Sequence, residues 1–188
     1  MNRKYFLSSF VPLGATLVAM GEGKNMDEPD GNLKIPPYLK KGDVIGITCP
    51  AGFITQKDIE PAIIKMNQWG FEIKIGTTIG KQDFTFGGTD TERLLDFQDM
   101  LDDNNVKAIM CARGGYGAVR IIDQIDFKKF VHHPKWIIGF SDVTVIHSHV
   151  NKNFGIATTI LKCVIVFQKT GAKPNPSKLN LLTLYNNA

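Results

Sequence analysis

The chain has 188 residues, of which 43% are hydrophobic and 21% charged. These values are ordinary for a globular protein and allow one good core with a short appendage. The net charge of +4 is mild, and Lys and Arg form no stripe, so nothing indicates nucleic-acid binding. The cysteines Cys49, Cys111 and Cys163 form no C-x-x-C pair and adjoin no His cluster. This spacing argues against a metal site and a disulfide framework.

The first 26 residues are typical of a targeting segment. Arg3 and Lys4 form a short basic start, and residues 5–20 are an apolar stretch broken by two serines and a proline. This is the layout of a secretory signal, and the apolar run is too interrupted to predict a stable membrane span. We therefore expect an export signal over residues 1–26 and a periplasmic or exported protein; an N-terminal arm on a cytoplasmic protein is the alternative. Residues 27–34 are expected to be a polar linker.

Strand-like and helix-like segments alternate after the linker. Apolar runs predict four strands, at Val44–Thr48, Phe71–Ile75, Val106–Cys111 and Lys135–Phe140. Apolar residues at helical spacing predict helices over Asp58–Trp69, from a Thr89-Asp90 cap onward, and over Ala118–Ile125 and Val143–Val150. This alternation predicts an α/β fold, a parallel sheet flanked by helices on both faces.

Three loops follow predicted strands, at Cys49–Gly52, Arg113–Gly117 and Phe140–Asp142. In a parallel sheet the functional loops lie beyond the carboxyl ends of the strands. We therefore look for chemistry in these three segments.

The last of these loops carries a candidate nucleophile, Ser141. An apolar run at residues 136–138 meets a Gly-Phe pair, and Ser141 and Asp142 then precede a helix-like segment. A strand that breaks at glycine into a serine and then a helix can hold the hydroxyl on a sharp turn, which suits a nucleophile. The pattern is G-x-S-D rather than G-x-S-x-G. On these residues alone, the alternative is that Ser141 or Asp142 simply caps the next helix.

The Arg113–Gly117 loop places three glycines directly after a strand. Such a backbone can approach a ligand closely and present N–H groups to an anion. The spacing matches neither G-x-G-x-x-G nor G-x-x-x-x-G-K-[ST], which leaves nucleotide binding as the weakest interpretation. We interpret the loop as one side of an oxyanion hole, with a second N–H from Asp142. A tight strand-to-helix turn is the alternative.

Four motifs follow one another along the chain: K-G-D-x-I-G-x-x-x-P at 41–50, G-T-D-x-x-R at 88–93, A-R-G-G-Y-G at 112–117 and I-G-F-S-D-x-T at 138–144. In this order and spacing they resemble the LD-carboxypeptidases. That family includes the muramoyl-tetrapeptide carboxypeptidases and the microcin-immunity peptidases. The resemblance implies that residues 35–160 form a flavodoxin-like N-terminal domain.

The resemblance also implies an activity. Family members are serine peptidases with a Ser-His-Glu triad and no cofactor or metal. They remove the terminal D-amino acid from an L-D bond in murein (peptidoglycan) tetrapeptides or cleave related amides. The expected partner is thus a peptidoglycan peptide, and full-length members are expected to be homodimers.

Site residues follow by matching the motifs. The nucleophile would be Ser141, and the oxyanion donors would be the backbone N–H groups of Asp142 and Gly115. Arg113 and Tyr116 would line the substrate pocket. We further expect Arg113 to hold a substrate carboxylate through a bidentate contact.

The family's Glu and His belong to a C-terminal domain that lies beyond residue 188. The four histidines, His132, His133, His147 and His149, do not match the family's catalytic His. The last two fall on a predicted helix, where a surface or core role is expected. We therefore expect this chain alone to be nearly inactive. The alternative is a non-catalytic fragment that binds murein peptides.

Residues 161–188 contain no Asp or Glu, although the chain has 18 of them. The family resemblance also stops at residue 160. We hypothesise that a frameshift or premature stop produced this divergent tail, so that the C-terminal domain is missing. A genuine short variant is the alternative.

Overall fold

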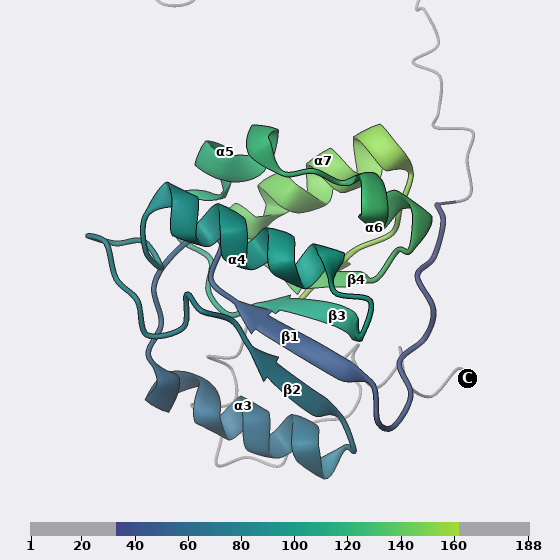
Figure 1. Cartoon of the computed structure of the whole chain (residues 1–188), viewed down its shortest axis with the longest axis horizontal. Coiled ribbons are helices and arrows are strands. Elements are labelled where there is room, and N and C mark those ends of the chain that lie inside the picture. Colours follow the sequence, from purple (N-terminus) through teal and green to yellow (C-terminus); the bar gives the residue numbers. More distant parts are fainter. Residues whose placement is uncertain (1–32, 162–188) are drawn as a thin grey trace, which may run out of the picture. The chain divides into compact units, whose positions relative to one another are not determined.

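The computed structural model describes residues 33–161, in which helices flank one parallel sheet (Figure 1). The strands are β1 (Val44–Thr48), β2 (Glu72–Ile75), β3 (Val106–Cys111), β4 (Trp136–Gly139) and β5 (Thr159–Ile160). The helices are α3 (Gln56–Gln68), α4 (Asp90–Asp102), α5 (Ala118–Ile121), α6 (Lys128–His132) and α7 (Thr144–Phe154), with 3₁₀ turns η1 (Ile122–Gln124) and η2 (Ser141–Val143).

Some predictions lie outside the described residues. They are the export signal, most of the linker, Cys163 and all but the first residue of the tail. These stay predictions. Within residues 33–161, none of the helices combines the length and apolar character that crossing a membrane requires.

The strand order is β2-β1-β3-β4-β5, and each neighbouring pair is parallel. This is the flavodoxin-like order, so the predicted fold class is confirmed. The chain turns to opposite sides of β1 when it adds β2 and then β3, which makes the carboxyl ends of β1 and β3 the switch point of the sheet. Ligands of open α/β sheets bind outside such a point.

Helices cover the two faces of the sheet unequally. Helix α3 lies on one face, whereas α4, α5, α6 and α7 lie on the other (Figure 1). Side chains alternate between the faces: Met110 and Ile138 join the core cluster beneath α3, while Ile109 and Ile137 join the cluster on the other side. Both faces of the central strands are therefore buried, which explains why their sequences are continuous apolar runs.

The structure corrects several predicted boundaries. The helix predicted over Ala118–Ile125 is one turn of α-helix, α5, followed by the 3₁₀ turn η1. Neither α6, with five residues, nor β5, with two, was predicted. Such short elements contain too few residues to show a helical or alternating apolar period.

Helix α4 begins at the predicted cap. The Thr89 hydroxyl accepts a hydrogen bond from the Glu92 backbone N–H, and the Glu92 carboxylate accepts one from the Thr89 N–H, which completes a capping box. The hydrogen bond from Lys81, and to a smaller extent those from Thr89, lower the pKa of Glu92 from 4.5 to about 2. The cap fixes where α4 starts, and α4 carries two buried polar side chains toward the sheet edge.

One of these is Asp96, which lies beneath the carboxyl end of β1. Its carboxylate accepts hydrogen bonds from the hydroxyls of Thr48, at 2.6 Å, and Thr78, at 2.5 Å. It also accepts bonds from the Thr77 hydroxyl and from the backbone N–H groups of Thr77 and Thr78. Asp96 thereby joins α4 to the end of β1 and to the loop after β2.

We expect Asp96→Ala to lower the free energy of unfolding by about 3 kcal/mol, because it leaves two buried threonine hydroxyls and two amides without their acceptor. Urea denaturation followed by circular dichroism measures the loss. Asp99→Ala is the matched control on the same helix. Asp99 is largely exposed and pairs with Lys74, so its loss should be under about 1 kcal/mol. Equal losses for the two variants would contradict a structural role for Asp96.

Candidate active site

The three loops singled out in the sequence meet at the carboxyl edge of the sheet. The Gly52 N–H donates a hydrogen bond to the Gly114 carbonyl oxygen at 3.0 Å, which joins the first loop to the second. Gly114 in turn packs on the third loop: a Cβ atom there would lie 2.8 Å from Ser141 Cβ and 3.0 Å from the Phe140 carbonyl oxygen. A side chain at position 114 would therefore push the glycine loop away from Ser141.

Ser141 adopts a strained backbone conformation at the end of β4. Its φ angle is +59°, in the left-handed region that non-glycine residues rarely enter. Such strain costs on the order of 1–3 kcal/mol and is found at functional sites. The turn is tight, because a Cβ on Gly139 would lie 2.6 Å from Val143 Cγ1. The Ser141 side chain is exposed, so the turn presents the hydroxyl as a strand-to-helix nucleophile elbow does.

Asp142 connects the elbow to the glycine loop. Its carboxylate oxygen Oδ2 accepts a hydrogen bond from the Ala118 backbone N–H at 2.8 Å, at the start of α5. Neither Ser141 nor Asp142 caps the helix that follows them, since α7 has no side-chain cap bond. The local-cap alternative is therefore wrong. The Asp142 side chain instead holds a segment that is 24 residues away in sequence.

Two groups that the predicted chemistry requires have no partner inside the domain. Across residues 33–161, the Gly115 backbone N–H donates no hydrogen bond and the Ser141 hydroxyl makes none. Gly115 has a φ angle of +130° and packs on the Gly52 backbone. Both groups are thus available to a bound molecule, as an oxyanion donor and a nucleophile must be.

The predicted pocket residues Arg113 and Tyr116 are both exposed. Arg113 Nη1 donates a hydrogen bond to the Phe53 carbonyl oxygen at 2.9 Å, and its guanidinium carbon lies 5.4 Å from the centre of the Phe53 ring. The other N–H groups of Arg113 donate to no atom in the described part of the chain. Tyr116 is 82% exposed. A carboxylate contact by Arg113 stays a prediction, and one face of its guanidinium is already used.

Sequence reasoning assigned no role to Arg93, which is completely buried under the same loops. Its guanidinium donates to the carbonyl oxygens of Pro50 at 2.6 Å, Gly117 at 2.8 Å and Gly88 at 3.2 Å, and it pairs with Asp90. The first loop and the glycine loop are thus joined through one cation. A signal was present in the sequence, because Arg93 shares a helical face with the buried residues Phe97 and Met100.

No histidine within residues 33–161 is bonded to Ser141. The His147 ring is buried, and its Nε2 lies 3.1 Å from the Gly139 carbonyl oxygen. His149 stacks on Phe127, with 5.2 Å between the ring centres. The expectation that these two histidines serve the core or surface is thus in agreement with the structure. In the same range, no cluster of three or more His, Cys, Asp and Glu side chains is placed to hold a metal ion.

We expect Arg93→Met to lower the free energy of unfolding by about 3 kcal/mol, because the buried carbonyls of Pro50 and Gly117 lose their donor. Amide hydrogen exchange should also quicken at Gly114 to Gly117. Arg120→Met is the matched control, since Arg120 also pairs with Asp90 but is exposed. It should cause a small loss of stability and leave the exchange of the glycine loop unchanged. Unchanged exchange in Arg93→Met would contradict its role.

Burial lowers the pKa of His147 below its usual 6.5, against a smaller opposite effect of its bond to Gly139. At a pH just below 6.5 the imidazole of His147 therefore binds a proton more readily in the unfolded chain than in the folded one. As the pH falls from 6.5 toward the lower pKa of the folded state, this preference reduces the free energy of unfolding. We expect His147→Gln, which keeps a donor for the carbonyl, to lose less stability than the wild type between pH ~7.5 and pH ~5. Urea denaturation at both pH values measures this. An identical pH dependence would contradict the assignment.

Comparisons with known proteins identify the family of this domain. A family model described as the LD-carboxypeptidase N-terminal domain matches residues 45–161. The probable murein peptide carboxypeptidase of Bacillus subtilis is 37% identical over 123 residues, which cover 65% of this chain and 39% of that protein. The murein tetrapeptide carboxypeptidase of Pseudomonas aeruginosa is 26% identical over 110 residues, or 58% of this chain and 36% of that protein.

A solved structure shows the same fold. The MccF-like protein from Bacillus anthracis superposes with a TM-score of 0.73 at 23% identity, over 80% of this chain and 47% of that one. In each comparison the chain spans less than half of the relative's length. The family model, however, covers more than half of this chain. The chain therefore belongs to the LD-carboxypeptidase family, through its N-terminal domain.

Proposed function

We propose that this domain supplies the nucleophile and the oxyanion hole of a serine-type LD-carboxypeptidase that removes a terminal D-amino acid from murein peptides. The observation that carries the proposal is the left-handed Ser141 at the end of β4, packed against the backbone of Gly114. Two relatives named as murein peptide carboxypeptidases support the substrate class. Arg113 and Tyr116, both exposed in the glycine loop, are the candidates for substrate contact.

In the proposed reaction, Ser141 Oγ attacks the carbonyl carbon of the L-D amide while a base takes its proton. The carbonyl oxygen becomes an oxyanion that accepts hydrogen bonds from the backbone N–H groups of Gly115 and Asp142. When the tetrahedral intermediate collapses, the C–N bond breaks and the D-amino acid leaves with the proton. Water then hydrolyses the Ser141 ester and restores the hydroxyl.

The base must come from outside residues 33–161. A serine hydroxyl at its ordinary pKa is a poor nucleophile without a base in hydrogen-bond reach. His147 is committed to Gly139, and His149 stacks on Phe127. Following the family resemblance, we assign the His and Glu of the triad to a C-terminal domain. This domain alone is then nearly inactive, with only the residual effect of its oxyanion hole.

The second candidate function is murein-peptide binding without catalysis. It is favoured by one observation, the absence of any partner for the Ser141 hydroxyl among the described residues. Binding requires the glycine loop and Arg113 but not a base. Cleavage and binding therefore have to be measured on the same protein.

The decisive experiment joins residues 1–160 to the C-terminal part of the Bacillus subtilis relative, beyond its matched segment, and measures D-alanine release from a murein tetrapeptide. We expect release by the fusion and almost none by the chain alone. Ser141→Ala in the fusion should lower kcat at least ~10³-fold, because the nucleophile is lost. Ser148→Ala, on an exposed position of α7, is the matched control and should leave kcat unchanged.

Each other outcome has a defined meaning. Release by the chain alone that depends on Ser141 would show that a base lies within the 188 residues. Release by the Ser141→Ala fusion would show that Ser141 is not the nucleophile. A folded fusion that binds the tetrapeptide by calorimetry, yet releases no D-alanine, would favour the binding function.

A further inference from the structure

A cavity lies at the opposite edge of the sheet from Ser141. It has a volume of about 580 Å³, within the range of small-molecule sites. Lys107 belongs to the start of β3, and Lys135 directly precedes β4, so the cavity adjoins the amino ends of these strands. Ser141 follows the carboxyl end of β4, and at ~3.3 Å per residue the four residues of this strand separate the two sites by at least about 13 Å.

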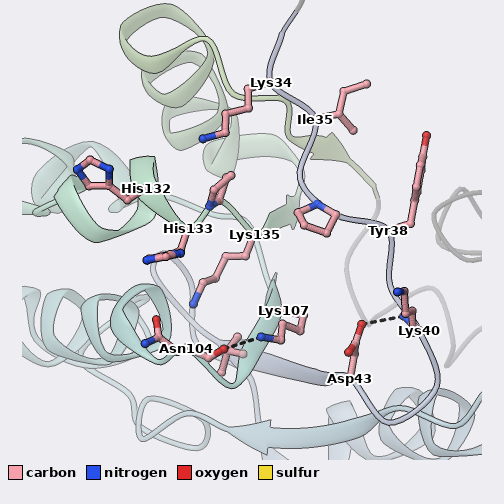
Figure 2. A pocket seen from close by; sticks show the side chains of 13 residues that line it. Lys34, Ile35, Tyr38, Lys40, Asp43, Asn104, Lys107, His132, His133 and Lys135 are labelled. Carbon is pink, nitrogen blue, oxygen red and sulfur yellow. Dashed lines mark hydrogen bonds between the residues drawn. The ribbon is translucent and has the colours of Figure 1, made fainter. Parts of the chain in front are cut away.

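Positive charge is concentrated around this cavity, which we call the basic pocket. Its charged lining consists of Lys34, Lys40, Lys107, Lys135 and Asp43, to which His132 and His133 are added. With both histidines counted as neutral, four ammonium groups face one carboxylate. Figure 2 shows that Lys34 and Lys40 come from the segment before β1, whereas Lys107 comes from β3 and Lys135 from the residue before β4.

Close neighbours neutralise little of this charge, although the carboxylates of Asp103 and Asp102 act on Lys135 at longer range. Within residues 33–161, none of the four forms an ion pair, whereas Lys74 and Lys81 on other surfaces pair with Asp99 and Glu92. The carboxylate of Asp43 accepts a hydrogen bond from the Lys40 backbone N–H, at 2.7 Å, rather than from a lysine side chain (Figure 2). The positive charge in the pocket is therefore in excess.

The ammonium groups of two of these lysines are instead oriented by hydrogen bonds to backbone carbonyl oxygens. Lys107 Nζ donates to the Asn104 carbonyl oxygen at 2.7 Å, and Lys34 Nζ donates to that of Val131 at 3.1 Å. A carbonyl orients an ammonium group without cancelling its charge, and each ammonium has three N–H donors. Both lysines thus keep donors for a bound molecule.

Lys135 shows that the charge is built into the domain. It is 5% exposed and donates to the carbonyl oxygens of Met100, at 3.1 Å, and Asp103, at 2.6 Å, where α4 ends. Burial lowers the pKa of Lys135 from 10.5 to about 8, so the group is still mostly protonated at neutral pH. The two carbonyls leave one of its three N–H donors for a further acceptor.

We propose that the basic pocket binds a small polyvalent anion, a compound whose phosphate or carboxylate oxygens accept hydrogen bonds from Lys34, Lys107 and Lys135. A polyvalent anion matches the excess of three positive charges, and a cavity of this size holds a small molecule rather than a polymer. The proposal is independent of the carboxypeptidase function, because the pocket shares no residue with the Ser141 site.

The test is calorimetric titration of the full chain with inorganic pyrophosphate and, separately, with citrate, at constant ionic strength. We expect saturable binding of at least one probe with Kd below ~1 mM. Tighter binding of pyrophosphate would indicate that the pocket recognises phosphate groups, and tighter binding of citrate would indicate carboxylates. Trp136 reports the location, since its indole N–H donates to the carbonyl oxygen of Pro37 in the pocket wall. Its fluorescence should change in a Trp69→Phe background, which removes the other tryptophan.

The decisive variant is Lys34→Gln/Lys107→Gln, which changes two exposed lining residues that the proposal assigns to the anion and should weaken binding about tenfold. The matched control, Lys57→Gln/Lys152→Gln, removes the same charge from exposed positions on α3 and α7. Its Kd should stay within about twofold of the wild type. Equal weakening of both double variants would show only unspecific attraction to a basic chain and overturn the proposal. So would the absence of saturable binding for both probes up to ~10 mM.

Discussion

The buried guanidinium of Arg93 is the interaction on which the geometry of the candidate site depends. Loops at the edge of a sheet carry backbone carbonyls that need donors, and burial without them is costly. Arg93 provides donors to the first loop at Pro50 and to the glycine loop at Gly117, and a guanidinium can do so in several directions at once. A shorter cation with a single nitrogen could not reach both loops in this way. The spacing of the two loops therefore depends on one side chain of α4 together with the hydrogen bond from Gly52 to Gly114.

Asp142 connects the elbow to the same framework. Its carboxylate bonds to the N–H of Ala118, the residue that follows Gly117. Gly117 is held in turn by Arg93, so the chain of contacts runs from β4 to α4 through the glycine loop. This framework keeps Ser141 in a conformation that an isolated peptide would leave, because strain at one residue persists only when its neighbours determine its position. The turn at Ser141 is thus held by contacts within the domain itself.

Much of this arrangement could be predicted from the sequence, because it follows from local patterns. The apolar runs at Val44–Thr48 and Val106–Cys111 predicted central strands, and their parallel pairing placed the three loops at one edge. The break from strand through glycine to Ser141 predicted a sharp turn, and the φ angle agrees. Each of these inferences uses residues that lie next to one another in the chain, so the local pattern of apolar residues and glycines is enough to predict the structure.

The features that the sequence did not predict are of two kinds. Some depend on contacts between residues that lie far apart in the chain, and others place a charged side chain in the interior, where such side chains are rare. An arginine on an amphipathic helix is expected at the surface, so Arg93 was not assigned to the interior. The carboxylate of Asp142 was considered only as a cap for the next helix, whereas its partner belongs to α5. The basic pocket joins segments that precede different strands, and no spacing rule relates Lys34 to Lys135. Which polar side chains become buried depends on how the helices and loops pack, and that packing exists only in the folded chain.

In the two proposals made above, the two ends of the short strand β4 belong to two separate sites. Its four buried residues hold Lys135 at one edge of the sheet and lead to Ser141 at the other. A strand with both faces packed is rigid, so the side chains at its ends are placed more exactly than side chains on a long loop would be. Under the proposed function such rigidity matters, because the Ser141 hydroxyl would have to meet a base that lies outside residues 33–161. If the proposed function holds, this geometry lies within the domain, and catalysis then requires a proton acceptor but no rearrangement of the fold.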